Sequence, residues 1–310
     1  MGWVGIRNLA QNKGMGELRV NFLHDMDWVL PLRSDAATHL ANAFTWLGYT
    51  NFFLIALPLA YWLWDRERAT RLTILIAITA VINGWLKDLW QDPRPDEKYW
   101  LDERVTGSYG RPSGHAQVAA AMWLWLAYEL RRPWAWGAAL VIVAGVSLSR
   151  LYLGVHDPDD VLTGIGLGLA GIFIFAWLLS PTFDVARRWP AALHLAIIAL
   201  AAVVLFYTWP NGEKPDATLT VLALLFGWVA GADMDRRLAP EAPVLPAWWL
   251  RIVMGVAGVV ALFLLRDALM KAAATLALDA SIAGYGIGAF LGFYMTAIAP
   301  MAFRLVRLVK

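Results

Sequence analysis

The sequence contains no cysteine. This absence excludes disulfide bonds, cysteine nucleophiles and cysteine metal ligands. Charged residues are also few, at 16% of the 310 residues, compared with about one quarter in an ordinary soluble domain. The net charge of +2 provides no strongly basic surface, so we expect no nucleic-acid partner. The first twenty residues lack the apolar core of a secretory signal, so we expect no cleaved leader.

Apolar residues make up 59% of the chain and gather in long runs that polar residues rarely interrupt. A run of about 20 mostly apolar residues is long enough to cross a membrane as a helix. The sequence therefore predicts an all-α fold, a polytopic transmembrane helical bundle with about nine spans. The predicted spans are Ala41–Trp64, Leu72–Leu86, Ala116–Leu130, Trp134–Ser149, Val161–Leu179, Ala191–Trp209, Ala217–Ala232, Trp248–Leu265 and Ile282–Leu305.

The chain divides into three predicted regions. Residues 1–40 mix apolar and charged side chains, as an amphipathic segment lying on a membrane surface does. Residues 41–210 are predicted to form a six-span core that carries all of the polar motifs, and residues 211–310 a three-span C-terminal extension. The glycines of the 164–168 segment predict close helix packing. We interpret Asp233 and Asp235, in the extension, as a solvated helix end.

The polar residues of the core fall into three short motifs. They supply three cations, two histidines and one carboxylate, which are the groups that a site needs to hold a phosphate and break its ester bond. The motifs are Lys87-x6-Arg94-Pro95, Pro112-Ser113-Gly114-His115 and Ser149-Arg150-x5-His156-x3-Asp160.

Two of the motifs contain the signals of a helix start. Ser113 precedes Gly114 and a long apolar run, so it resembles an N-cap, and the free N–H groups of such a helix start suit a phosphate. Asp157 followed by Pro158 repeats the signal. Asp160 then falls in the first helical turn, where its carboxylate reaches back towards His156. One imidazole nitrogen would be held by the carboxylate and the other left free to attack.

The remaining charged groups suit phosphate binding and proton transfer. Arg94 and Arg150 offer planar forks that match two phosphate oxygens each, and Lys87 adds a compact charge. His115 is the candidate general acid that protonates the leaving oxygen. Fixed cations and amides that stabilise the transferring phosphoryl group are expected to contribute the larger share of catalysis.

These motifs resemble the signature of the type 2 phosphatidic acid phosphatase superfamily, which includes glucose-6-phosphatase and the vanadium haloperoxidases. The resemblance covers roughly Leu72–Leu179. It implies that His156 attacks phosphorus to form a phosphohistidine, that His115 acts as general acid and that Asp160 orients the nucleophile. It also implies hydrolysis without a metal or cofactor, in a six-helix membrane bundle whose site lies at the outer face.

Several residues beside the motifs admit two interpretations. The acidic residues of the first motif's loop either repel poorly matched anions or simply solvate the loop, and the second interpretation is favoured. Arg111, directly before the second motif, is either a further phosphate contact or an ordinary interfacial cation. The acidic residues in question are Asp92, Asp96, Glu97, Asp102 and Glu103.

Basic residues predict the orientation in the membrane. Most of those outside the motifs and the N-terminal segment fall in loops on one face, which the positive-inside rule assigns to the cytoplasm. We expect a protein of the inner or plasma membrane, with the motif loops on the periplasmic or extracytoplasmic side and the C-terminus in the cytoplasm. The basic residues that carry this expectation are Arg66, Arg68, Arg71, Arg131, Arg132, Arg187, Arg188, Arg236, Arg237, Arg304, Arg307 and Lys310.

The leading functional hypothesis is a membrane phosphatase that acts on a lipid phosphate, such as phosphatidate, phosphatidylglycerol phosphate or an isoprenyl diphosphate. One alternative is a hydrolase of a soluble sugar phosphate, because Arg94-Pro95 followed by the 99–102 segment resembles the glucose-6-phosphatase branch. A second alternative is a phospholipid binder or transporter without hydrolytic activity. The lipid bilayer and the substrate are the expected partners, and nothing in the sequence identifies a protein partner.

Overall fold

The computed structural model describes residues 23–105, 107–180, 189–212, 214–239 and 247–305. Helices and connecting loops make up all of this described part, and it contains no strand. Its α-helices are α2 (Asp35–Trp46), α3 (Thr50–Leu63), α4 (Arg66–Trp90), α5 (Gly114–Leu130), α6 (Pro133–Tyr152), α7 (Pro158–Leu178), α8 (Ala191–Thr208), α9 (Asp216–Leu238), α10 (Trp248–Thr275), α11 (Ala280–Phe293) and α12 (Ala299–Leu305). Short 3-10 turns are η1 (Asp27–Leu32), η2 (Glu97–Tyr99), η3 (Glu103–Val105) and η6 (Pro210–Gly212), and the π-helical η7 (Tyr294–Ile298) joins α11 to α12.

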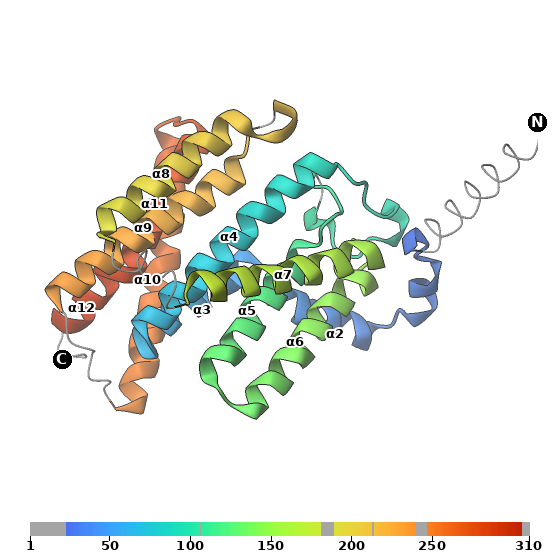
Figure 1. The fold of residues 1–310 in the computed structure, drawn as a ribbon, viewed down its shortest axis with the longest axis horizontal. Coiled ribbons are helices and arrows are strands. Elements are labelled where there is room, and N and C mark those ends of the chain that lie inside the picture. Colours follow the sequence, from blue (N-terminus) through green and yellow to red (C-terminus); the bar gives the residue numbers. More distant parts are fainter. Residues whose placement is uncertain (1–22, 106, 181–188, 213, 240–246, 306–310) are drawn as a thin grey trace, which may run out of the picture.

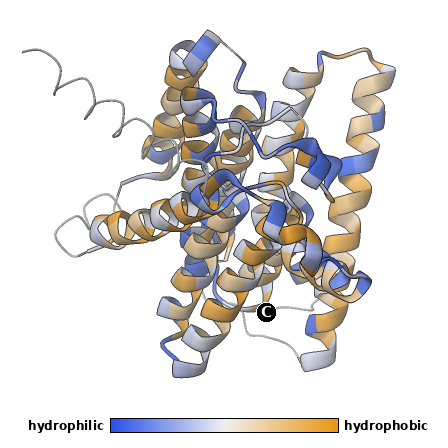
Figure 2. Ribbon diagram, turned by 90° about the vertical axis from the view of Figure 1, so that its right-hand side faces the viewer, coloured by the Kyte–Doolittle hydropathy of each residue, from blue (hydrophilic) through white to orange (hydrophobic). Residues whose placement is uncertain are grey.

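The all-α membrane bundle predicted from the sequence is confirmed. Each predicted span coincides with a helix or a pair of consecutive helices. Seven helices of the described part are long and apolar enough to cross a membrane, or eight if α2 and α3, which meet at a bend of 52°, count as one. The one predicted span outside this set is Ala116–Leu130. It lies in α5, which has 17 residues and most of its side chains buried against other helices. Figure 2 shows mainly hydrophobic helices and more hydrophilic connecting loops.

Helix α5 lies at the centre of the part of the molecule that carries the motifs. It packs against α4, α6 and α7, and α2 covers α6 (Figure 1). The contact with α7 is especially close, because a Cβ atom added at Gly168 would lie 2.6 Å from the Gln117 carbonyl oxygen of α5. A Cβ atom at Gly164 would lie 2.6 Å from the Ser113 carbonyl oxygen. This confirms the close packing predicted for the 164–168 segment at Gly164 and Gly168, whereas an added Cβ atom at Gly166 would have nothing within 4 Å.

The C-terminal helices form a second group that is continuous with the first. Helix α9 packs against α4, α8 and α11, and α10 packs against α3 (Figure 1). One hydrophobic cluster runs from Leu72 of α4 through Trp228 of α9 to Met295 of η7. Helix α8 belongs to the predicted six-span core by sequence, but α9 is its main packing partner.

Residues 23–40 of the predicted N-terminal segment lie in the described structure. Helix α2 already begins at Asp35, because the Ser34 hydroxyl caps it by accepting a hydrogen bond from the Ala37 N–H. In η1, Val29 is buried together with Met26 and packs against Tyr99 of the first motif's loop, whereas the large apolar side chains Trp28, Leu30 and Leu32 are exposed. Residues 1–22 lie outside the described residues.

A buried ion cluster ties the opposite end of the bundle together. Asp235 has no exposed surface, and it accepts hydrogen bonds from the Tyr61 hydroxyl at 2.9 Å and from Arg304 at 2.7 Å. Arg66 Nε lies 3.3 Å from the same carboxylate. The interpretation of Asp235 as a solvated helix end is therefore wrong, because α3, α4 and α12 bring three donors to it.

Candidate active site

The three motifs meet at one end of the bundle because consecutive helices run in opposite directions. Lys87 lies in the last turn of α4 and Arg150 in the last turn of α6. His115 lies at the start of α5, and His156 precedes the start of α7. Arg94 lies in the loop that joins α4 to α5. Residues up to 73 positions apart, from Lys87 to Asp160, thereby form one cluster.

His156 is held in a single orientation. Its Nδ1 lies 2.8 Å from Asp160 Oδ2, and its Nε2 lies 3.1 Å from Arg94 Nη1. A carboxylate accepts and a guanidinium donates, so Nδ1 carries the proton and Nε2 presents its lone pair. The pair is 2% and 0% exposed.

The start of α7 holds the carboxylate in place, as its sequence signals predict. Asp157 is the N-cap and Pro158 the first helical residue. The Asp157 side chain accepts from the Asp160 N–H at 2.9 Å, and Asp160 Oδ2 accepts from the Asp157 N–H at 3.4 Å. This reciprocal capping box fixes the turn that brings Asp160 back to His156.

The surroundings of His156 favour its neutral form. Burial lowers the pKa of His156 well below its ordinary value of 6.5, and the charges of Arg94 and Lys87 lower it further. A neutral imidazole with a free Nε2 is the form in which a histidine side chain acts as a nucleophile.

Backbone carbonyls position two of the three cations. Lys87 donates to the Tyr109 carbonyl and, at 2.8 Å, to the Gly110 carbonyl. Arg94 donates through Nε to the Ser108 carbonyl at 2.6 Å and through Nη1 to the Val155 carbonyl at 2.6 Å. Burial and the charge of Arg150 lower the pKa of Arg94 to about 10, so it stays protonated at neutral pH.

Arg150 is held by side chains instead. Its Nη1 donates to Thr45 Oγ1 at 2.5 Å and to Asp102 Oδ2 at 3.2 Å. Its Nε and Nη2 are buried and have no hydrogen-bond partner among the described residues. These two nitrogens form one side of the guanidinium fork, which is the geometry that binds two oxygens of a phosphate.

The start of α5 adds further free polar groups. Ser113 is the N-cap by position, but its hydroxyl makes no capping bond and finds no partner within the described part of the chain. The Ser113 N–H donates to the Asp160 carbonyl at 2.9 Å, which joins the two helix starts. Gly114 permits close packing here, since an added Cβ atom would lie 2.9 Å from Asn83 Oδ1. The predicted N-cap position of Ser113 is confirmed, and its hydroxyl remains free for a ligand.

His115 lies on the side of the cluster formed by the bend between α2 and α3. Its Nε2 is buried without a partner in the described ranges. The Tyr49 ring meets the imidazole edge-on, with 4.9 Å between ring centroids. A Cβ atom at Gly48 would lie 2.2 Å from His115 Cδ2, so only glycine leaves room for this ring.

The sequence interpretation missed the role of Asp102. It is 3% exposed and pairs with Arg150, so neither repulsion of anions nor loop solvation describes it. Thr45 and Tyr49 also line the cluster, but they belong to no recognisable sequence motif. The second ambiguous residue, Arg111, pairs with Asp159 at 2.5 Å and lies over the Trp90 ring at the rim.

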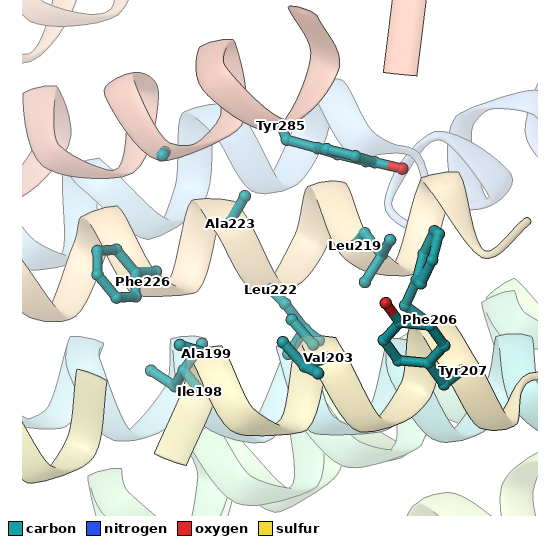
Figure 3. Close-up of a pocket in the computed structure, with 12 residues that line it drawn as sticks. Ile198, Ala199, Val203, Phe206, Tyr207, Leu219, Leu222, Ala223, Phe226 and Tyr285 are labelled. Atoms are coloured by element: carbon teal, nitrogen blue, oxygen red, sulfur yellow. The ribbon is translucent and has the colours of Figure 1, made fainter. Parts of the chain in front are cut away.

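An apolar pocket of about 480 Å³ lies elsewhere, between α8, α9 and α11. Figure 3 shows Val203 and Phe206 of α8, Leu222 of α9 and Tyr285 of α11 around it. None of the motif residues lines this pocket. The candidate active site is instead the motif cluster, which holds the oriented imidazole and the polar groups without a partner. Among the residues that the structure describes, no group of three or more histidine or acidic side chains could hold a metal ion.

Comparison with known proteins gives a match over the part of the chain that carries the motifs. Residues 68–184 match the PAP2 superfamily, and this range contains all three motifs. Sphingosine-1-phosphate phosphatase 2 of Mus musculus is 28% identical over 57% of this chain and 53% of its own length. Dihydrosphingosine 1-phosphate phosphatase YSR3 of Saccharomyces cerevisiae is 28% identical over 43% of this chain and 36% of its own.

A plant relative, lipid phosphate phosphatase delta of Arabidopsis thaliana, is 29% identical over 66% of this chain and 56% of its own length. The matches with these three curated relatives cover between 36% and 56% of the relatives' own length. No solved structure matches it.

Proposed function

We propose that this integral membrane protein, whose residues 68–184 match the PAP2 superfamily, is a phosphatase that hydrolyses a lipid phosphate through a phosphohistidine. The observation that carries this proposal is the state of His156, whose Nδ1 is held by Asp160 while Nε2 faces Arg94. A site that only binds phosphate needs the cations but has no use for an oriented, unprotonated imidazole nitrogen.

Phosphate binding uses the polar groups that have no protein partner in the described structure. The Nε–Nη2 side of Arg150 takes two phosphate oxygens, and the Ser113 hydroxyl and first N–H groups of α5 take a third. Each buried polar group without a partner costs about 1–3 kcal/mol, so a bound phosphate relieves several such costs at once. Lys87 and Arg94 balance the remaining charge.

In the first chemical step, the lone pair of His156 Nε2 attacks phosphorus and the ester P–O bond breaks. The incoming phosphate displaces the contact between Nε2 and Arg94. His115 Nε2 transfers a proton to the leaving alkoxide, which departs as an alcohol. The dianionic phosphate beside His115 favours the protonated form that this transfer needs. Asp160 stabilises the positive charge that develops on His156.

In the second step, water attacks the phosphohistidine. His115, now neutral, accepts a proton from that water, the P–N bond breaks and inorganic phosphate leaves. The free His156 is restored with its proton on Nδ1. No metal or cofactor takes part in the proposed sequence, in which Arg150, Arg94 and Lys87 stabilise the charge on the phosphoryl oxygens.

A lipid substrate is favoured over a sugar phosphate. The relatives are named as phosphatases of sphingoid phosphates and of lipid phosphates. The site also lies at the ends of membrane-spanning helices, where a lipid headgroup reaches it from the bilayer. Trp90 and Trp100 near the site have the amphipathic character of interfacial side chains.

Phosphate release by the purified protein in detergent, with excess chelator, tests the proposal. The substrates are sphingosine 1-phosphate, phosphatidate, an isoprenyl diphosphate and glucose 6-phosphate. We expect chelator-resistant release from a lipid phosphate that His156→Ala abolishes and that His194→Ala, on α8 beside Trp189, leaves unchanged. Faster release from glucose 6-phosphate would favour the sugar-phosphate alternative. Binding of phosphate with no turnover of any compound would favour a binder or transporter.

We further propose that the site faces the periplasm or cell exterior and that the C-terminus is cytoplasmic, in the inner or plasma membrane. The natural absence of cysteine makes this testable by single-cysteine labelling in intact cells. Glu97→Cys lies in the loop of the first motif, and Arg131→Cys lies in the short turn between α5 and α6; both positions are exposed. A membrane-impermeant maleimide is expected to label only the former. Labelling of Arg131→Cys alone would reverse the orientation.

A further inference from the structure

Asp102 is a fully satisfied carboxylate next to the candidate site. Its Oδ2 accepts from the Tyr49 hydroxyl and from Arg150 Nη1 at 3.2 Å. Its Oδ1 accepts from Arg104 Nε at 2.7 Å and from the Arg104 N–H at 3.3 Å. Burial by itself raises the pKa of Asp102, but the groups that donate to it outweigh burial and hold the pKa well below its ordinary value. It is therefore a permanent anion and has no proton to give to the reaction.

The hydrogen bonds of Asp102 determine which part of Arg150 is free. Asp102 and Thr45 both bind Nη1, and Nε and Nη2 are left without a partner in the described part of the molecule. An arginine that turned about its last bonds would offer different nitrogens to a ligand. The Asp102 carboxylate and the Thr45 hydroxyl together keep the Nε–Nη2 side of the guanidinium available to phosphate, rather than the Nη1–Nη2 end.

The Asp102 carboxylate is also linked to His115, the candidate general acid, through the side chain of Tyr49. The Tyr49 hydroxyl that binds Asp102 belongs to the ring that packs edge-on against His115. The guanidinium carbon of Arg104 lies 4.2 Å from the centroid of the Tyr49 ring, and Arg104 also binds Asp102. Asp102 thus connects the bend between α2 and α3 to the loop of the first motif. It contacts Arg150 directly and His115 through the Tyr49 ring.

We propose that Asp102 is a positioning residue for phosphoryl transfer, which holds the guanidinium of Arg150 with its two-nitrogen side towards the phosphate. This inference rests on the proposed function of the same site. Asp102 touches neither the substrate nor the reacting atoms and acts through Arg150. Its loss therefore affects the transition state, in which the phosphoryl oxygens must match a fixed fork, more than it affects ground-state binding of an anion.

Asp102→Asn is the central test, with Glu103→Gln as its matched control. Both changes remove one negative charge at adjacent positions, but Glu103 is exposed. Because misplacement of a substrate-holding group by about 1 Å costs about 100-fold in rate, we expect Asp102→Asn to lower kcat about 100-fold with KM changed by less than about threefold. Glu103→Gln is expected to match the wild type.

Two milder variants protect the test against misfolding of Asp102→Asn. Thr45→Val removes the other acceptor of Arg150 Nη1, and Tyr49→Phe removes one donor to Asp102 but keeps the ring against His115. Both are expected to fold, as judged by the wild-type thermal midpoint, and to lower kcat to values between those of Glu103→Gln and Asp102→Asn. Wild-type kcat in both folded variants, or in Asp102→Asn, would overturn the proposal.

A binding measurement separates this inference from the proposed function. Orthovanadate mimics the five-coordinate phosphorus of the transition state, and its binding is read as a rise in the thermal midpoint. We expect Asp102→Asn to reduce that rise, Arg150→Ala to abolish it, and the double variant to equal Arg150→Ala, because coupled residues are not additive. A further loss from Asp102→Asn in the Arg150→Ala background would show that Asp102 acts independently of Arg150. If the wild type hydrolyses nothing, the proposed function fails while this arm still gives its answer.

Discussion

Replacing Asp160 with asparagine tests how the structure orients His156, the proposed nucleophile. Asp160 Oδ2 accepts from His156 Nδ1 at 2.8 Å in a buried environment. Asparagine preserves the shape of the side chain but removes its charge, and its NH2 group can donate to Nδ1. In that arrangement the proton moves to Nε2, where it blocks the attacking lone pair. Even with the amide oxygen facing Nδ1, the positive charge that develops on His156 loses its counter-ion.

The size of the effect follows from that charge. Two unit charges about 4 Å apart interact by about 4 kcal/mol at an effective dielectric constant of about 20. Each 1.36 kcal/mol is about tenfold in rate, so the lost interaction corresponds to about a thousandfold decrease in kcat. In a serine protease, the same change at a carboxylate that orients an imidazole lowers kcat by about 10⁴.

Phosphate release from a lipid phosphate under saturating conditions measures this decrease. Asp159→Asn is the matched control, because it removes a charge one residue away, where Asp159 pairs with Arg111 at the rim. Rapid quenching with labelled substrate adds a second readout, since a slower first step keeps the phosphohistidine from accumulating. An Asp160→Asn enzyme that retained more than about a tenth of the wild-type kcat would refute the assignment of this carboxylate as the orienting group.

Three further predictions concern pH, packing and buried charge. Nuclear magnetic resonance of ring-labelled histidine should give His156 a titration midpoint below 6.5, so that the nucleophile remains neutral as the pH falls towards that value; a midpoint at or above it would contradict the burial argument. Gly168→Leu should destabilise the protein by about 1–3 kcal/mol through overpacking against α5, whereas Gly166→Leu, with nothing within 4 Å of its added Cβ, should leave the thermal midpoint unchanged. Asp235→Ala should cost about 3 kcal/mol because it removes the buried carboxylate that two partly buried arginines share, and equal stability of Asp235→Ala and the partly exposed control Asp233→Ala would show that the cluster contributes nothing.

Local chemistry made part of the site predictable from the sequence. The Asp157-Pro158 start of α7 and the return of Asp160 to His156 depend on residues within four positions of one another. Capping and proline preferences act over this range, so the sequence alone contains the cause. The close contact of Gly164 and Gly168 with a neighbouring helix was predictable for a similar reason, although the identity of that helix was not.

Partners that are distant in the chain were not predictable. Asp102 reads as one acid among five in a polar loop, and its ion pair with Arg150 spans 48 residues. Thr45 lies 105 residues from the same arginine. Asp235 and Tyr61 are 174 residues apart. A carboxylate in a sequence looks the same whether it is solvated or buried, because only the packing of other helices around it brings its donors.

The amino-acid sequence by itself therefore determined the membrane-spanning helical class of this protein, the residues of its three motifs and the helix starts that place His156 beside Asp160. Each of these depends on apolar runs or on contacts between near neighbours in the chain. Only the tertiary structure decided that α8 packs on α9, that the bend between α2 and α3 supplies Thr45 and Tyr49, and that Asp102 fixes the free side of Arg150. These features depend on which helix ends meet in space, and that is set by the packing of the whole bundle.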